Sequence, residues 1–182
     1  MENLTTMLQI VLPAAMVGGI AYFIVYKYLQ YEENKLKLEI DKSRLEIVFP
    51  ARMQAYERIT LYLERITPEN LVRRVIKGNT SVRVFQSEMI ATVRSEYEHN
   101  ISQQIYISLA SWAMVKTATE ESIRLVNVAA AKINASAQAT DLAEKILEIS
   151  TQIGKFPTHM AIEHIKKEFA QYFIQANLTN PE

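Results

Sequence analysis

The chain has 182 residues, and its 20 Lys and Arg balance its 20 Asp and Glu, so its formal net charge at pH 7 is zero. A balanced charge gives no basic field, so nucleic-acid binding is not expected. The absence of cysteine excludes disulfides, thiol catalysis and thiolate metal sites. With 4 Gly and 5 Pro, the sequence has too few turn residues for an all-β fold and predicts an all-α protein.

The most distinctive stretch is the N-terminal run from Thr5 to Tyr26. No charged residue occurs between Glu2 and Lys27, which leaves 24 uncharged residues. About 20 apolar residues in a helix span the hydrocarbon core of a bilayer. A cleaved signal peptide needs a positive N-terminal region, and a buried core helix is normally shorter or amphipathic, so neither alternative fits. The sequence predicts a single transmembrane helix, with residues 1–27 as the anchor.

Basic residues lie on one side of this span only. The N-terminal flank has none, and the other flank carries Lys27, Lys35, Lys37, Lys42 and Arg44. Because cytoplasmic flanks are enriched in Lys and Arg, we expect the N-terminus outside and the body of the protein in the cytoplasm.

Small residues recur inside the span. Ala14 and Gly18, and likewise Ala15 and Gly19, are four residues apart. This spacing lets a second transmembrane helix approach closely. Small residues are also common in such helices without any contact, so both interpretations stay open.

The chain after the anchor divides into three parts. Residues 28–49 are densely charged and predict a juxtamembrane stem helix. Pro50 is expected to end this helix with a bend at Phe49, because a proline disfavours helical geometry in the residue before it. Residues 50–176 predict an antiparallel bundle of four to five helices, and residues 177–182 a frayed tail.

Local signals divide the bundle into helices. Thr67 and Pro68 mark a helix start, since Thr is a good N-cap and Pro is favoured at the first helical position. No Gly or Pro occurs from 79 to 153, so we place a hidden break near Ile107, with Ser108 as the next N-cap. The other expected boundaries are Gly78, a cap at Ser81, a turn over 134–141 with Thr140 or Asp141 as cap, and Gly154.

Apolar residues at intervals of three and four define the buried face of each helix. The predicted inward residues are Ala55, Ile59, Tyr62 and Ile66; Val82, Phe85, Met89, Val93 and Tyr97; and Ile162, Ile165, Phe169, Tyr172 and Phe173.

Two stretches, 51–66 and 93–107, mix charged, aromatic and amide side chains more densely than a plain bundle needs. An internal network of ion pairs and tyrosines between the two helices explains them, and so does a polar face for a partner; we favour the internal network. The candidate residues are Arg52, Tyr56, Glu57, Arg58, Glu64, Arg65, Arg94, Tyr97, His99 and Gln103.

Glu96 and His99 have the Glu-x-x-His spacing of di-iron bundles. Such a site needs a second copy of the motif, and neither His159 nor His164 follows a Glu by three residues. We therefore expect no metal site, no cofactor and no catalytic residue.

Three motifs carry a resemblance to a known family: QAYERITLYLERITPENL (54–71), VRSEYEHNISQQIYIS (93–108) and ATEESIRLVNVAAAKI (118–133). Together they resemble an uncharacterised family of Bacteroidota whose members have one N-terminal transmembrane helix and a helical body. The resemblance implies a bacterial inner-membrane protein, and it carries no activity. In that family a proline often follows the residue matching Ser108, whereas this chain has Leu109.

Three functions follow from these features. The leading hypothesis is a structural or adaptor subunit whose partners are the lipid bilayer and other membrane subunits or a second copy, with no small-molecule substrate and no enzyme activity. The second is a stalk subunit resembling the b subunit of ATP synthase, against which the helix-breaking residues argue. The third is a metal-binding bundle enzyme centred on Glu96 and His99.

Overall fold

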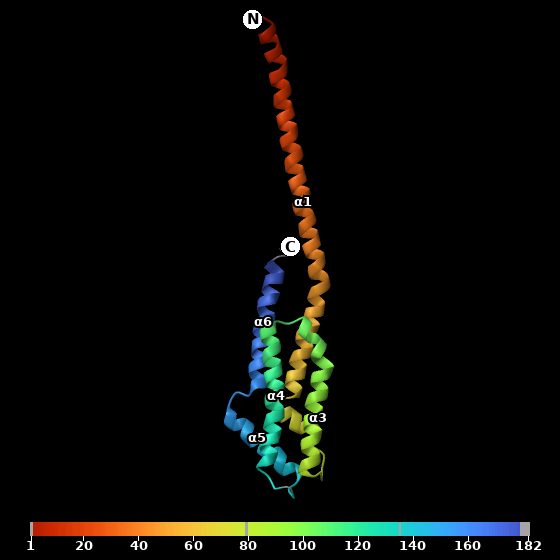
Figure 1. Ribbon diagram of the computed structural model, residues 1–182, viewed down its shortest axis with the longest axis vertical. Coiled ribbons are helices and arrows are strands. Elements are labelled where there is room, and N and C mark those ends of the chain that lie inside the picture. The colour runs from red at the N-terminus through yellow and green to blue at the C-terminus, as the bar shows by residue number, and fades with distance from the viewer. Residues whose placement is uncertain (1, 79, 135, 179–182) are drawn as a thin grey trace. The chain divides into compact units, whose positions relative to one another are not determined.

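The computed structural model describes residues 2–78, 80–134 and 136–178 (Figure 1). All regular elements within these residues are helices, which confirms the predicted all-α class. Side chains are described except for those of residues 2–6, 8–11, 13–14, 41–46 and 175–178. Of the expected tail, residues 179–182 lie outside the described part of the chain.

The chain forms two compact units, Met1–Ile47 and Val48–Glu182. Helix α1 (Glu2–Arg65) contributes residues to both. In the first unit, the described apolar side chains of this helix are exposed, among them Val17 at 67% and Ile20 at 61%. Among the described residues, no helix is both long and apolar enough to cross a membrane. Much of the expected span, residues 5–6, 8–11 and 13–14, lies outside the described side chains, so the transmembrane helix stays a prediction.

The predicted end of the stem helix before Pro50 is wrong, because α1 passes through Pro50 without a break. The aromatic ring of Phe49 lies 6.1 Å from the ring of Tyr172 and 6.0 Å from that of Phe173. Both partners belong to α6 (Pro157–Leu178). On the other side of the proline, the Arg52 guanidinium lies 4.5 Å from the centre of the Tyr172 ring. Packing on both sides of Pro50 thus holds its neighbours in helical geometry and offsets the missing backbone donor.

Replacing Pro50 by alanine is expected to raise the free energy of unfolding by about 1–3 kcal/mol, because alanine supplies the missing N–H donor and removes the crowding of the ring. Thermal unfolding followed by circular dichroism measures this. The matched control is Pro157→Ala, at the first position of α6, where proline is favoured and no gain is expected. An unchanged melting temperature for Pro50→Ala would mean that the chain up to Pro50 unfolds separately from the bundle.

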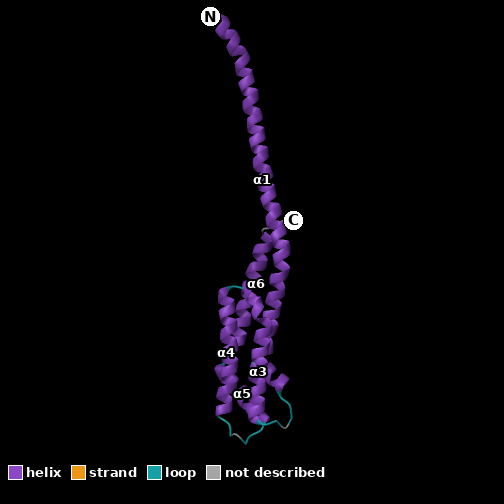
Figure 2. Cartoon of the chain, turned by 45° about the vertical axis from the view of Figure 1, so that its right-hand side comes forward, coloured by secondary structure: helices purple, strands orange, loops and turns teal. Residues whose placement is uncertain are grey.

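Four long helical segments build the second unit: residues 48–65 of α1, α3 (Val82–Asn100), α4 (Leu109–Ala131) and α6 (Figures 1 and 2). Their directions follow from side-chain partners. Arg65 and Arg58 of α1 meet Glu96 and His99 of α3. The later residue of α1 thus meets the earlier residue of α3, so the two helices are antiparallel. Tyr62 of α1 meets Thr119 of α4, and Ile66, the residue after α1, meets Ser122, so α1 and α4 are parallel. Phe49 and Tyr56 of α1 meet Tyr172 and Glu168 of α6, so α1 and α6 are antiparallel as α1 and α3 are, which confirms the predicted antiparallel bundle.

Shorter elements connect the long helices. Helix α2 (Pro68–Val75) follows α1, the 3₁₀ helix η1 (Ile101–Ile105) joins α3 to α4, and α5 (Ala139–Ile153) joins α4 to α6. Helix α5 packs against α2, α3 and α4 at one end of the bundle. A single antiparallel bridge between Ser81 and Gln138 ties the two loops there together.

Two of the predicted helix caps are confirmed. The Ser108 hydroxyl accepts a hydrogen bond from the Ser111 backbone N–H at 3.1 Å, and α4 begins at the next residue. The Ser81 hydroxyl accepts from the Val84 N–H at 3.4 Å at the start of α3. Gly154 ends α5 with a backbone φ of +75°, a conformation that favours glycine.

Three predicted boundaries differ in detail. Thr67 occupies the N-cap of α2, but its hydroxyl donates to the Glu64 carbonyl at 2.9 Å instead of capping the helix. Helix α2 ends at Val75, before the predicted boundary at Gly78. The N-cap of α5 is Gln138, and Asp141 acts from inside the first turn, where its carboxylate accepts the Gln138 N–H at 2.9 Å.

The predicted buried faces of α1 and α3 form the centre of the core. Tyr62, Phe85 and Met89 are each at most 1% exposed, as the three- and four-residue periodicity requires. Phe173 is an exception, since its side chain is 44% exposed. It lies at the edge of the bundle, where its ring contacts only Phe49 and Phe169 among the described aromatic side chains.

Candidate functional site

The densest polar cluster in the bundle is centred on Glu168 of α6, and we call it the Glu168 node. One carboxylate oxygen, Oε1, accepts the Tyr56 hydroxyl at 2.5 Å and the Ser108 backbone N–H at 3.1 Å. The other, Oε2, accepts the Ser108 hydroxyl at 2.5 Å and the Ser111 hydroxyl. Four hydrogen bonds to one carboxylate thus connect α1, α4 and α6.

The node forms where α4 begins. Ser108 is the N-cap of α4, so the negative charge of Glu168 lies at the positive end of the helix dipole. Tyr56 and Ser111 are 5% and 0% exposed, which means that their hydroxyl groups need a partner inside the protein. Glu168 supplies that partner to both.

Burial alone would raise the pKa of Glu168. The hydrogen bonds from Ser108, Ser111 and Tyr56 outweigh burial and lower the pKa of this carboxyl to about 2. Burial, followed by the hydrogen bond to Glu168, raises the pKa of Tyr56 above its ordinary value. The node therefore keeps an ionised carboxylate and a protonated tyrosine at neutral pH, a state that suits a structural connection.

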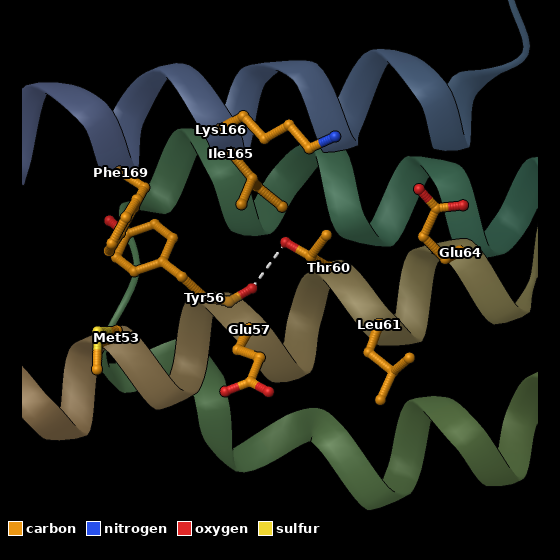
Figure 3. A pocket seen from close by; sticks show the side chains of 9 residues that line it. All are labelled: Met53, Tyr56, Glu57, Thr60, Leu61, Glu64, Ile165, Lys166 and Phe169. Atoms are coloured by element: carbon orange, nitrogen blue, oxygen red, sulfur yellow. Dashed lines mark hydrogen bonds between the residues drawn. The ribbon is translucent and has the colours of Figure 1, made fainter.

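A groove lies beside the node, between α1 and α6, and we call it the α1/α6 groove (Figure 3). Its volume is about 600 Å³, within the range of ligand-binding clefts. Helix α6 supplies three of its lining residues and α1 supplies the rest. The lining residues are Met53, Tyr56, Glu57, Thr60, Leu61, Glu64, Ile165, Lys166 and Phe169.

The floor of the groove is fixed and its edge is open. The Tyr56 ring lies 5.3 Å from the Phe169 ring, and its hydroxyl is held by the Glu168 node. On α1, the Thr60 hydroxyl donates to the Tyr56 carbonyl at 2.7 Å (Figure 3). Met53 and Leu61 are 48% and 50% exposed, so the groove presents apolar side chains to solvent. An exposed apolar groove of this kind is typical of a binding surface.

Several sequence-predicted polar residues lie between α1 and α3. Glu96 forms ion pairs with Arg65 at 3.2 Å and with Arg74 of α2 at 2.8 Å. Burial alone would raise the pKa of Glu96, but the hydrogen bonds from Arg74 and Arg65 lower it. The Arg58 guanidinium lies 3.4 Å from Nδ1 of His99. The partners of Glu96 and His99 are thus arginines, and the described residues contain no group of three potential metal ligands.

Tyr97 lies between two other rings. Its centre is 6.4 Å from that of Tyr62 and 5.7 Å from that of Trp112. The Tyr62 hydroxyl in turn shares a hydrogen bond with the Thr119 hydroxyl at 2.6 Å. These contacts connect α1, α3 and α4 inside the bundle.

The remaining candidate residues are dispersed. Glu57 and Glu64 line the α1/α6 groove, Arg94 lines a smaller pocket between α3 and α4, and the Gln103 amide donates to the neighbouring Ser102 hydroxyl at 3.2 Å. Ala15, Gly18 and Gly19 are exposed, and a Cβ at either glycine would have nothing within 4 Å among the described atoms. The side chain of Ala14 lies outside the described residues.

The fold and the Glu168 node define an all-helical bundle protein whose helices are joined by buried polar contacts. Residues 2–172 match a family described as "Family of unknown function (DUF7935)", and the chain belongs to this family. No curated protein and no solved structure matches the chain. The family match confirms the predicted resemblance to an uncharacterised family.

Proposed function

We propose that the chain is a single-pass membrane protein that acts as a structural subunit and presents its helical bundle to other proteins. The observation that carries the proposal is the composition of α1. Residues 3–26 of this helix are uncharged, and residues 53–64 of the same helix form one wall of an exposed apolar groove. One helix thus combines a candidate anchor with a candidate binding surface.

Exposed apolar side chains support the anchor. Met16, Val17, Ile20, Phe23 and Ile24 are each at least 60% exposed. A continuous apolar surface of this kind is unfavourable in water and is favoured in a lipid bilayer or a protein contact. The basic residues that follow Tyr26 support an N-terminus outside and a cytoplasmic bundle. The proposal includes localisation in the inner membrane of a bacterium of the Bacteroidota. The resemblance of the three sequence motifs supports this part.

Purification from membranes tests the proposed assembly role. The tagged full chain is extracted in mild detergent, and its native mass and its companions are determined. We expect a stoichiometric complex with other membrane subunits. The same extraction with an unrelated single-pass protein is the control. A monomer without companions, or a purified chain that turns over a substrate, would contradict the structural role.

The proposed orientation has a clean test because the chain has no cysteine. Single cysteines are introduced at Glu2, before the span, and at Leu109, which is 90% exposed in the bundle. In intact spheroplasts a membrane-impermeant maleimide is expected to label only Glu2→Cys. After lysis it is expected to label both Glu2→Cys and Leu109→Cys. Labelling of Leu109→Cys before lysis would show that the bundle lies outside, which is the opposite orientation.

The unbroken helix favours a second candidate function. Since α1 continues through Pro50, that proline no longer argues against a stalk subunit resembling the b subunit of ATP synthase. The compact unit that begins at Val48 weighs against a stalk. A large hydrodynamic radius for residues 48–182 in solution would favour the stalk, and a compact one the adaptor.

A further inference from the structure

We propose that the α1/α6 groove binds an amphipathic helix of another protein, one that carries two basic residues seven positions apart beside its apolar face. This inference rests on the proposed function, because it names the surface and the partner chemistry of the same assembly role. The size of the groove, its apolar floor and the charges on its walls carry it.

The dimensions of the groove fit a helix. On α1 the lining extends from Met53 to Glu64, which corresponds to roughly 17 Å at 1.5 Å per residue, or three helical turns. Met53 and Leu61 are eight residues apart and both are about half exposed. Residues at this spacing lie on one face of α1, so an incoming helix can pack its apolar residues between them and Phe169.

The charges of the groove are available for a partner. Glu57 and Glu64 on α1 and Lys166 on α6 take part in no ion pair among the described residues. Elsewhere in the described bundle many acidic side chains are paired, namely Glu88, Glu96, Glu121, Glu148 and Glu163. The wall formed by α1 is thus acidic and unneutralised.

The spacing of these charges specifies the partner. Glu57 and Glu64 are seven residues apart, so they lie on the same side of α1 about two turns from each other. A helix that runs along α1 meets both if its own basic residues are also seven apart, as in the charged edges of coiled coils. Lys166 lies on the opposite wall, so the partner helix is expected to carry an acidic or neutral residue on its edge facing α6.

Two synthetic amphipathic peptides test this inference on the full chain in zwitterionic lipid nanodiscs. They share one apolar face, and one carries Arg and the other Glu at two positions seven residues apart. Fluorescence anisotropy of the labelled peptides measures binding, and empty nanodiscs give the background. We expect the Arg peptide to bind about tenfold more tightly than the Glu peptide, because its two arginines pair with Glu57 and Glu64.

The variant Glu57→Lys/Glu64→Lys is expected to reverse this preference. The control Glu69→Lys/Glu144→Lys changes the net charge equally on exposed residues that do not line the groove, and it should leave the preference intact. Circular dichroism establishes that both variants are folded.

Equal binding of the two peptides, or a preference that survives the reversal in the groove, would overturn the inference. So would a homodimer of the full chain that the groove variant dissociates, since the occupant would then be a second copy. If membrane partners co-purify equally with wild type and the groove variant, the proposed function stands and the groove inference fails.

Discussion

Replacing Glu168 by glutamine is expected to lower the free energy of unfolding by about 3 kcal/mol at neutral pH. The carboxylate is only 20% exposed, and its pKa falls from the ordinary 4.5 to about 2 on folding, which corresponds to a contribution of that size. Glutamine keeps the shape of the side chain but not its charge. For a domain of this length, the melting temperature should fall by roughly 6–12 °C, as measured by circular dichroism.

The matched control is Glu163→Gln, at a position five residues earlier on α6. Glu163 pairs with Lys155 at 2.5 Å, but both side chains are 53% exposed. Surface pairs contribute little to stability, so this variant should melt close to wild type. A similar loss in both variants would show that α6 responds to any loss of charge and that the Glu168 node has no special role.

The difference between wild type and Glu168→Gln should disappear in acid. Because the folded-state pKa of Glu168 lies below its unfolded value, its contribution is complete above about pH 5 and is lost as the pH falls towards 2. Protonated Glu168 then resembles glutamine. Urea unfolding of both proteins at several pH values measures the difference, and a constant difference from pH 7 to pH 2.5 would contradict this account.

Local patterns predicted most of the helices correctly. Ser108 and Ser81 cap helices because a serine hydroxyl competes well for the free N–H groups of a first turn. The buried faces that hold Ile59 and Phe85 follow from the helical period alone. Both signals lie within a few residues of sequence, and no knowledge of the tertiary structure is needed to interpret them.

Contacts between distant residues could not be predicted in this way. Tyr56 and Ser108 lie 112 and 60 positions from Glu168, and nothing near Glu168 in the sequence distinguishes it from an ordinary surface glutamate. The continuous helix at Pro50 has the same explanation. Pro50 predicts that Phe49 leaves the helix, but the opposing contacts with Tyr172 and Phe173 come from residues far along the chain.

The sequence predicts only part of the α1/α6 groove. The sequence places Tyr56, Glu57 and Glu64 among the candidate polar residues, but it is compatible with both an internal network and a partner face. The structure places Tyr56 in a buried node and Glu57 and Glu64 on the groove. The same stretch of α1 therefore carries both an internal hydrogen bond and part of an exposed groove, and composition alone cannot separate the two.

The variant Val17→Arg/Ile20→Arg is expected to abolish membrane attachment. Each arginine near the centre of a membrane-spanning helix costs roughly 2.5–3.5 kcal/mol of insertion free energy, so two cost about 5–7 kcal/mol. Wild type should remain in the membrane pellet after alkaline carbonate extraction, and the variant should move to the supernatant. The control Leu36→Arg/Leu38→Arg adds the same charge to exposed positions of the charged segment of α1, and it should stay in the pellet.

Each contrary result of this extraction has its own physical meaning. If wild type is already in the supernatant, the uncharged run of residues 3–26 does not anchor the chain, and its exposed apolar side chains require a protein partner instead. If the double-arginine variant remains in the pellet with wild type, the bundle or its partners attach the chain to the membrane. Only the separation of Val17→Arg/Ile20→Arg from both wild type and control supports a transmembrane anchor in α1.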